Sequence, residues 1–440
     1  MRFNQPNATA IALNRVLGQD PSQILGNLSA NGQVFILNPN GVLFDTGSQA
    51  NVGGLVASTL SLSDADFMAG NNTFSNGGTA GAVVNRGTLT AAQGGYIALL
   101  APEVRNEGVI SATLGTALLA AGDKVTLTPN NGSLLSYSID QGALNALADN
   151  KHLIQADGGQ VFMSAKAANA LSTAMVNNTG IIEARTVQNV AGVIMLMGDM
   201  QVGTVNVGGT LDASAPNGGN GGFIETSAAH VKVANDAKVT TAAPNGNSGT
   251  WLIDPVDFTI AASSGDITGA ALGTLLDSNN ITIQTATGTN TPTNLYGSTG
   301  TNGDIHVNDA VSWSTNNTLT LDAFRNININ QSITATGASG KLALLYGQGS
   351  TDGVIGGVTS AYNVNAPVNL RAGPNFSTKL GSTGTVKGYT VITSLGLAGR
   401  ATSADLSVPT SARSAAPGPW ARSAMPAGRW ALSVDWWETT

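Results

Sequence analysis

The sequence predicts an all-β protein in the form of a β-solenoid, a coil of short strands stacked on one another. The first observation behind this prediction is the composition. Charged residues make up 10% of the 440 residues and aromatic residues 5%, while apolar residues reach 42% and 55 positions are glycine. Average globular domains carry about a quarter charged residues. Small side chains in such excess favour a repeat architecture, in which each repeat packs on its neighbours.

The second observation is a recurring segment made of Gly, two mostly β-branched or Leu residues, one variable residue and Ala. It occurs as GTLTA at 87–91, GVISA at 108–112, GIIEA at 180–184 and GTLDA at 209–213. Short alternating runs bounded by Asn and Gly predict strands with tight corners. We expect the apolar centres of these segments to point inward. These centres are Leu89, Ile110, Ile182 and Leu211.

A third observation is a second segment, Gly followed by alternating apolar residues, that follows most copies of the first. Examples lie at 94–101, 158–165, 192–197 and 221–227. A fixed order of strand, corner and strand, repeated along the chain, is what a solenoid needs. Because each coil buries its core face only against its neighbours, no single coil is expected to be stable alone.

Two stretches carry helix signals. Residues 140–151 place leucines three positions apart, and residues 164–175 are rich in alanine. This spacing and composition predict one to three helical turns in each stretch, packed on the flank of the solenoid.

Charge and composition exclude several classes of function. The net charge is −7, and the basic residues form no cluster, so we expect no nucleic-acid partner. The chain has no cysteine, which excludes disulfides and thiolate chemistry. No apolar run approaches the about 18 residues of a membrane helix. Residues 1–10 contain no apolar signal-peptide core, so the chain as given is expected to lack a signal peptide and not to be exported.

Solenoids can carry catalytic carboxylate sites, so the acidic residues and histidines of this chain are candidates for catalysis. The closest carboxylates are two pairs, each two or three residues apart, and the histidines lack metal-ligand spacing. We expect all of these side chains to lie in turns, edges or surface corners, and we predict no catalytic residue, no cofactor and no metal site. The residues concerned are Asp64 with Asp66, Asp254 with Asp257, and the histidines His152, His230 and His306.

The segment VFILNPNGVLFD at 34–45 sets Asn38, Pro39, Asn40 and Gly41 between two apolar runs. Pro fixes φ at the second position of a turn, and Asn and Gly tolerate the positions that follow. The four residues therefore predict a type I or type II turn between two strands.

The surroundings of this turn resemble the secretion domain of the filamentous haemagglutinin family, the large exoproteins of bacterial two-partner secretion. Residues 4–67 carry the similarity most closely, with ALNRV at 12–16 and NVGGLVAS at 51–58, and it continues through 81–112 and 176–184. The family has two short turn signatures. One matches Asn38, Pro39, Asn40, Gly41 and Val42, and the other falls more loosely on Gln5, Pro6 and Asn7.

The resemblance implies a right-handed parallel β-helix of the pectin-lyase-like kind. It also implies export through an outer-membrane transporter of the TpsB type, whose periplasmic POTRA domains recognise the secretion domain. The exported protein would then act at the cell surface in adhesion or haemagglutination, on a glycan or protein receptor that the sequence does not identify. Two departures stand out: the family's domain begins upstream of Met1, and Asp45 stands where the family usually has Gly.

These observations give a domain plan and two alternatives to adhesion. We expect a truncated secretion domain at 1–135, β-helical shaft repeats at 136–254, a further solenoid module at 255–395, and an aberrant or disordered tail at 396–440. The amino-acid composition changes in that tail, where Ala, Gly, Pro, Arg and Trp predominate, as in an out-of-frame translation. The alternatives are the stalk of a contact-dependent growth inhibition toxin and a β-helical polysaccharide lyase or hydrolase.

Overall fold

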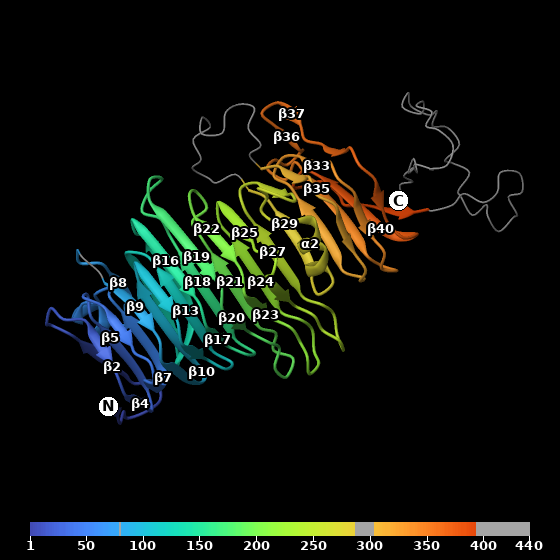
Figure 1. The fold of residues 1–440 in the computed structure, drawn as a ribbon. Coiled ribbons are helices and arrows are strands. Elements are labelled where there is room, and N and C mark those ends of the chain that lie inside the picture. The colour runs from blue at the N-terminus through green and yellow to red at the C-terminus, as the bar shows by residue number, and fades with distance from the viewer. Residues whose placement is uncertain (79–80, 287–302, 393–440) are drawn as a thin grey trace, which may run out of the picture.

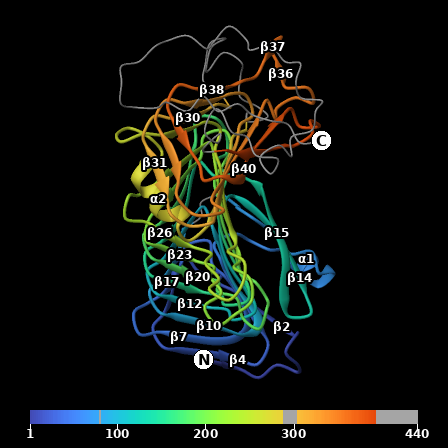
Figure 2. The same cartoon turned by 90° about the vertical axis from the view of Figure 1, so that its right-hand side faces the viewer.

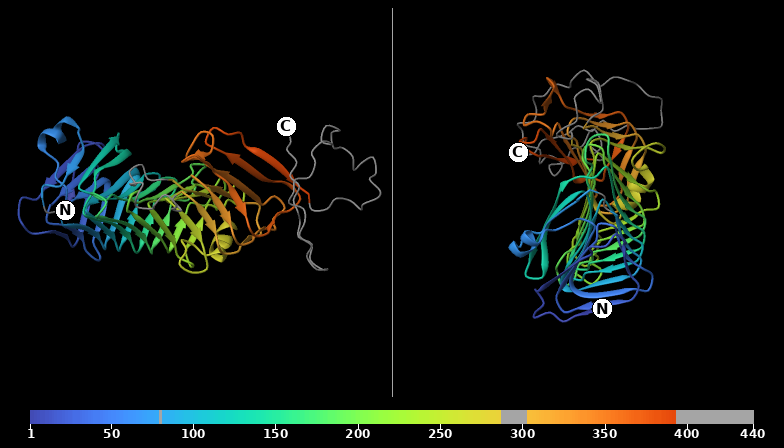
Figure 3. Two further views of the ribbon diagram at one scale, coloured as in Figure 1. Left: turned by 90° about the horizontal axis from the view of Figure 1, so that it is seen from above. Right: turned by 90° about the vertical axis from the view of Figure 1, so that its left-hand side faces the viewer.

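The computed structural model describes residues 1–78, 81–286 and 303–392. Within them the chain forms a parallel β-helix, a rod in which successive coils follow one another from the N-terminus (Figures 1 and 3). The predicted tail at 396–440 lies outside these residues. The all-β prediction is confirmed.

Three ladders of parallel strands enclose one core. Viewed down the rod, the ladders form the sides of the coil (Figure 2). The long strand β7 (Gln49–Ser58) shows how two ladders meet at a corner. Its residues 49–51 pair with β4, whereas residues 54–58 pair with β5. β10 (Thr88–Ala101) turns the same corner, with a shift of register between its two halves.

The first ladder consists of the three- and four-residue strands that contain the first recurring segment, together with the first halves of β7 and β10. Its other members are β1 (Arg2–Phe3), β4 (Asn27–Ala30), β12 (Val109–Ser111), β17 (Leu153–Gln155), β20 (Ile181–Glu183), β23 (Thr210–Asp212) and β26 (Lys238–Thr240). Further along the rod, β31 (Val311–Trp313), β34 (Ile333–Ala335) and β39 (Val368–Asn369) form a separate parallel sheet.

The second ladder is the longest and includes the second halves of β7 and β10. It ends with β41 (Lys387–Val391), which pairs antiparallel to the strand before it. Its other members are β2 (Ile11–Arg15), β5 (Gln33–Leu37), β13 (Thr116–Ala121), β18 (Gln160–Ala165), β21 (Val193–Met197), β24 (Phe223–Ser227), β27 (Thr250–Asp254), β29 (Asn280–Gln284), β32 (Thr318–Asp322), β35 (Lys341–Tyr346) and β40 (Gly373–Leu380).

The third ladder closes the coil. Its members are β3 (Ser22–Ile24), β6 (Val42–Phe44), β9 (Ala82–Asn85), β11 (Glu103–Asn106), β16 (Asn145–Asn150), β19 (Thr173–Asn178), β22 (Thr204–Val207) and β25 (His230–Val233). A separate parallel sheet of β28 (Phe258–Ile260), β30 (Ile305–Val307), β33 (Ile327–Ile329) and β38 (Tyr362–Val364) follows. A short hairpin joins β36 (Val354–Ile355) to β37 (Val358–Thr359).

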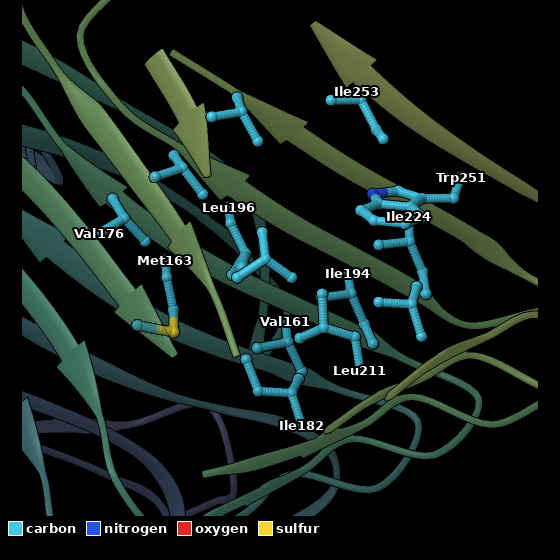
Figure 4. Close-up of a cluster of buried hydrophobic side chains, with 14 of the residues drawn as sticks. Val161, Met163, Val176, Ile182, Ile194, Leu196, Leu211, Ile224, Trp251 and Ile253 are labelled. Atoms are coloured by element: carbon cyan, nitrogen blue, oxygen red, sulfur yellow. The ribbon is translucent and has the colours of Figure 1, made fainter. Parts of the chain in front are cut away.

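The interior of the coil is a continuous apolar core. Alternate residues of every ladder point into it, as the close-up of the middle coils shows (Figure 4). Leu89, Ile110, Ile182 and Leu211 are all 0% exposed, which confirms that the recurring segments direct their apolar centres inward. Trp251 also lies in this core and pairs in register with the strands on both sides, so parallel stacking continues through 249–260. The predicted domain limits stay a prediction.

The two predicted helices at 140–151 and 164–175 are wrong. The first stretch holds the end of β15 and all of β16, and the second runs from the end of β18 to the start of β19. Their alanines serve the coil instead: Ala146, Ala148 and Ala174 are at most 2% exposed within the core. A small side chain is needed where the coil is narrow, and in this fold that need outweighs the helix propensity of alanine.

Two short helices arise elsewhere, among the described residues. α1 (Asp64–Ala69) begins at Ser63, whose side chain accepts a hydrogen bond from the Asp66 N–H, and ends at Gly70 in a left-handed conformation. α2 (Gly269–Leu276) begins at Thr268. It contacts β26 and β31, and so occupies the side of the coil where the first ladder is interrupted. No helix of the described residues has the length and apolarity needed to span a membrane.

Outside the coil lies a feature that the sequence did not predict. β14 (Lys124–Asn130) and β15 (Ser133–Gln141) form an antiparallel hairpin, and β8 (Thr73–Ser75) pairs with β14. We call this three-stranded sheet the covering layer. It stands beside the coil in Figure 2. Its apolar face packs on the outer face of the second ladder and creates a second hydrophobic core, which includes Phe35, Phe74 and Leu118.

Candidate functional site

The turn of Asn38, Pro39, Asn40 and Gly41 joins β5 to β6 and so passes from the second ladder to the third. The Gly41 N–H donates to the Asn38 carbonyl at 3.1 Å, as a four-residue turn requires. Asn40 is not among the residues with positive φ, which excludes type II and leaves type I. Gly41 has φ of +128°, a conformation that L side chains rarely adopt. The predicted turn is therefore confirmed as a corner of the coil.

Asn38 is a buried structural residue of this corner, with 0% exposure. Its side-chain Nδ2 donates to the Asp20 carbonyl at 3.0 Å and to Ser22 Oγ at 2.9 Å in the preceding coil. Its Oδ1 accepts the Asn40 N–H at 3.0 Å. The side chain thus ties the corner to its neighbour, and these bonds satisfy its own buried amide group.

Asn40 lies at the surface of the same corner. Its Nδ2 donates to the Gly18 carbonyl at 2.9 Å and to Asn38 Oδ1 at 3.2 Å. Beside it is a shallow hollow of about 250 Å³ that reaches from Pro21 across Val42 to Arg86. Asn40 and the hollow are the part of the corner that a partner can contact.

The following coil fixes the corner from its other side. The Gly81 N–H donates to the Pro39 carbonyl at 2.7 Å. A Cβ atom built on Gly81 would approach the Asn40 carbonyl oxygen to 2.5 Å, so a larger residue at 81 would displace the turn. Asp45, which replaces the usual Gly, accepts the Thr46 N–H through Oδ1 at 2.7 Å and fits its own turn.

The looser signature at Gln5, Pro6 and Asn7 lies at the opposite end of β5. Gln5 Nε2 donates to the carbonyls of Ala10 and Gln33, each at 2.7 Å, and its Oε1 accepts the Gly32 N–H at 2.9 Å. Asn7 is exposed and accepts from Thr9 through Oδ1. The structure therefore does not bring the two signatures together; they hold the two ends of one strand.

Gln33 is a residue of this region that the sequence analysis missed. It is 2% exposed, and its Oε1 accepts the hydroxyl proton of Tyr96 at 2.6 Å. Burial raises the pKa of that hydroxyl, so it remains a donor. A polar residue at the start of an otherwise apolar strand was the only sequence signal for this contact.

The two carboxylate pairs lie in different parts of the rod, one on α1 and the other at the end of β27. Asp64 makes an ion pair with Arg15 at 2.8 Å on the exposed start of α1, and Asp66 accepts from Ser63 there. Burial raises the pKa of both Asp254 and Asp257 to about 6, with Glu225 and Asp322 adding to the shift at Asp254. Among the described residues no three His, Asp or Glu side chains are placed to hold a metal ion.

The three histidines lie in separate coils. His152 and His230 are exposed, and His306 is half-buried with its Nδ1 3.5 Å from Asn328 Nδ2. His152 and His230 therefore lie at the surface as expected, whereas His306 lies in the middle of β30 with its Nε2 buried.

Comparison with known proteins assigns the N-terminal coils, which carry the covering layer and the two turns, to a known class of secretion domain. Residues 1–213 match the family model described as the TPS secretion domain. This part of the chain is accordingly the secretion domain of a two-partner-secretion exoprotein.

Known proteins support this assignment. The chain is 34% identical over 206 residues to a heme/hemopexin-binding protein of Haemophilus influenzae strain KW20, an alignment over 45% of this chain and 22% of that protein. A second heme/hemopexin-binding protein of Haemophilus influenzae is 32% identical over 223 residues, or 45% of this chain and 23% of the relative. The aligned part is thus under a quarter of either relative.

A solved structure shows the same fold. The HMW1 secretion domain of Haemophilus influenzae aligns with a TM-score of 0.52 and 22% identity, over 86% of this chain and 88% of that one. The similarity extends well beyond the residues matched by the family model, into the later coils.

Proposed function

We propose that this chain is the N-terminal part of a secreted adhesin, exported when the POTRA domains of its TpsB transporter recognise the secretion domain. The observation that carries the proposal is the matched secretion domain at 1–213, built as a run of stacked coils. The rest of the rod, up to residue 392, would serve as the shaft that presents an adhesive region at the cell surface.

Within this proposal, Asn40 and the adjacent hollow contribute to recognition, while Asn38 supports the fold. The support is the contrast in burial between the two amides. Asn38 is fully enclosed and bonded to the preceding coil, whereas Asn40 projects at the surface. Both residues belong to the turn that resembles the family signature, so the resemblance does not distinguish recognition from support of the fold. An experiment is needed to distinguish these two roles.

The test compares Asn40→Ala with Asn38→Ala in the full chain, carried behind a cleavable signal sequence beside a TpsB transporter. Asn40→Ala should lower the free energy of unfolding by no more than about 1 kcal/mol, because the lost bonds are solvent-exposed. Its secreted yield should nevertheless fall at least about tenfold. Asn38→Ala should cost about 3 kcal/mol, because it leaves buried polar groups without partners.

A matched control is Asn145→Ala, which also removes an exposed asparagine whose side chain makes one bond, to Thr173 Oγ1. Its melting temperature and secreted yield should both stay at the level of the unsubstituted protein. Normal export of Asn40→Ala would show that the transporter does not use this side chain.

Adhesion is tested separately by agglutination of erythrocytes and by binding of the secreted chain to glycan arrays. The alternatives predict other readouts. The stalk of a growth inhibition toxin would continue into a toxic C-terminal region in the full-length gene, and a polysaccharide enzyme would depolymerise glycans. The two carboxylate pairs described above lie on different elements, α1 and the end of β27, which does not favour the enzyme.

A further inference from the structure

The outer face of the second ladder stays apolar beyond the covering layer. One row of outward residues, in register from coil to coil, runs Val56, Ala98, Leu118, Phe162, Met195 and then Glu225. The neighbouring row holds Ser164 on β18, Met197 on β21 and Ser227 on β24. Glu225 is therefore the first charged residue in the row that contains Met195.

The covering layer ends one strand earlier. Its last strand, β15, lies above β18: the Tyr137 ring is 5.2 Å from the Phe162 ring, and its hydroxyl is 2.5 Å from Ser164 Oγ. Because strands in both layers are spaced by about 4.8 Å, the next strand position in the covering layer lies above β21. Met195 and Met197 of β21 are half-buried at that position.

An apolar groove of about 430 Å³ occupies this place. Tyr137 and Ile139 form one wall, Phe162 and the two β21 methionines form the floor, and Met200 closes the far side. Methionine side chains adapt to varied apolar surfaces, which suits a floor that must pack against another chain.

The wall of the groove is an open strand edge. Within the described residues β15 pairs only with β14. Lys166 Nζ donates to the Ile139 carbonyl at 2.9 Å, so Ile139 presents its backbone groups to the groove, and by strand alternation so does Tyr137. A lysine placed on such an edge is a common guard against unwanted pairing.

We propose that this groove binds one extended segment of another polypeptide, which adds to β15 as a fourth strand of the covering layer. Such a segment would place alternate apolar side chains on Met195 and Met197 and its backbone against Tyr137 and Ile139. It would continue the existing interface between the covering layer and the coil by one strand.

The shape of the site selects a single extended segment over a second copy of this protein. Antiparallel pairing of β15 with β15 of another copy would place both coils on the same side of the joined sheet. The space required for the second coil is already filled by β21, β24 and β27 of the first. Asp199 lines the groove and Glu225 lies next to Met195 in register, whereas Lys166 is the one cation among the described lining residues. The segment should therefore be flanked by Lys or Arg rather than by acids.

The probe is a synthetic peptide of about seven residues, alternating valine and threonine with a lysine at each end, offered to the full chain. A peptide of the same composition with its valines grouped together is the control. The alternating peptide should bind at least about tenfold more tightly, and it should slow amide hydrogen exchange at Tyr137 and Ile139.

Two variants test the floor and the edge. The double variant Met195→Thr, Met197→Ser introduces residue types that already occur in the same two rows, at Thr282 and Ser227, so the fold should persist. Its affinity for the peptide should fall about tenfold. Lys166→Ala should raise the affinity several-fold, because it frees the Ile139 carbonyl.

Three outcomes would overturn the proposal. One is equal binding of the alternating and grouped peptides. Another is protection from exchange away from β15. The third is concentration-dependent dimerisation that the methionine variant abolishes, which would assign the groove to a second copy. Because the peptide assay needs no transporter, its result is independent of the export assay.

Discussion

The N-terminal and C-terminal parts of the rod share one coil but differ on the outside of it. In the N-terminal part, outward residues of the second ladder such as Val56, Ala98 and Leu118 are 0% exposed beneath the covering layer. Further along the same row stand Thr282 and Thr320, which face outward half-exposed. The difference shows that the secretion domain is distinguished by its second hydrophobic core, and not by a different form of the β-helical coil.

The two parts also treat polar side chains differently. Four asparagines in the third ladder are fully buried and donate to one another from coil to coil at 2.7–2.8 Å. They are Asn85, Asn106, Asn150 and Asn178. A similar row in the C-terminal part, Asn308, Asn330 and Asn365, is exposed. A stacked amide row therefore stabilises the coil to a degree that depends on its burial.

The largest expected effect comes from the second core. Phe35→Ala removes a ring that packs against Phe67 and Phe74 beneath the covering layer. We expect a loss of about 4 kcal/mol in the free energy of unfolding, measured by urea titration. The matched change Thr320→Ala, on the uncovered part of the same ladder, should cost less than about 0.5 kcal/mol. Equal losses at the two positions would remove the distinction between the two parts.

A smaller effect is expected from the amide rows. Asn106→Ala removes the acceptor of Asn85 Nδ2 and the donor to Asn150 Oδ1 within a buried row, which should cost about 3 kcal/mol. Asn330→Ala breaks the exposed row, where water replaces the lost partner, and should cost less than about 1 kcal/mol. Urea titration of both variants decides whether burial or stacking alone governs the stability of such rows.

The smallest effect is a difference in pH dependence. Burial raises the pKa of Asp254, Asp257 and Asp322 to about 6, so the folded C-terminal part binds protons more tightly than the unfolded chain. Its stability should be highest below about pH 4 and should fall as pH rises through 6. In the N-terminal part, bonds from Arg86 and Lys151 lower the pKa of Glu107, so its contribution is lost as pH falls.

Melting curves between about pH 2.5 and pH 7 measure this difference, because the Glu107 contribution is lost below its ordinary pKa. Asp254→Asn with Asp322→Asn should flatten the decline at higher pH, because the amide stays neutral throughout. Glu107→Gln should flatten the opposite decline at acid pH and leave the first one unchanged. A decline toward pH 7 that persists in the double variant would assign it to other groups.

The sequence by itself determined the coil. Alternation in short runs decides which side chains can face one core, so Leu89, Ile110, Ile182 and Leu211 could be placed inward without a structure. The corner at Asn38–Gly41 was likewise predictable, because Pro restricts the local backbone conformation and Gly permits conformations that other residues avoid. The close resemblance over residues 4–67 indicated the secretion domain that the family model then matched at 1–213.

Only the tertiary structure decided what covers the coil and which polar groups are buried. The hairpin of β14 and β15 alternates like any other strand pair, and nothing local shows that it leaves the coil to pair with β8, about 50 residues earlier in the chain. The leucine spacing at 140–151 and the alanines at 164–175 indicated helices because these signals are local, whereas the fit of small side chains to a narrow core depends on neighbouring coils. Asn38 and Asn40 belong to one turn, and only packing against the preceding coil encloses the first and leaves the second at the surface.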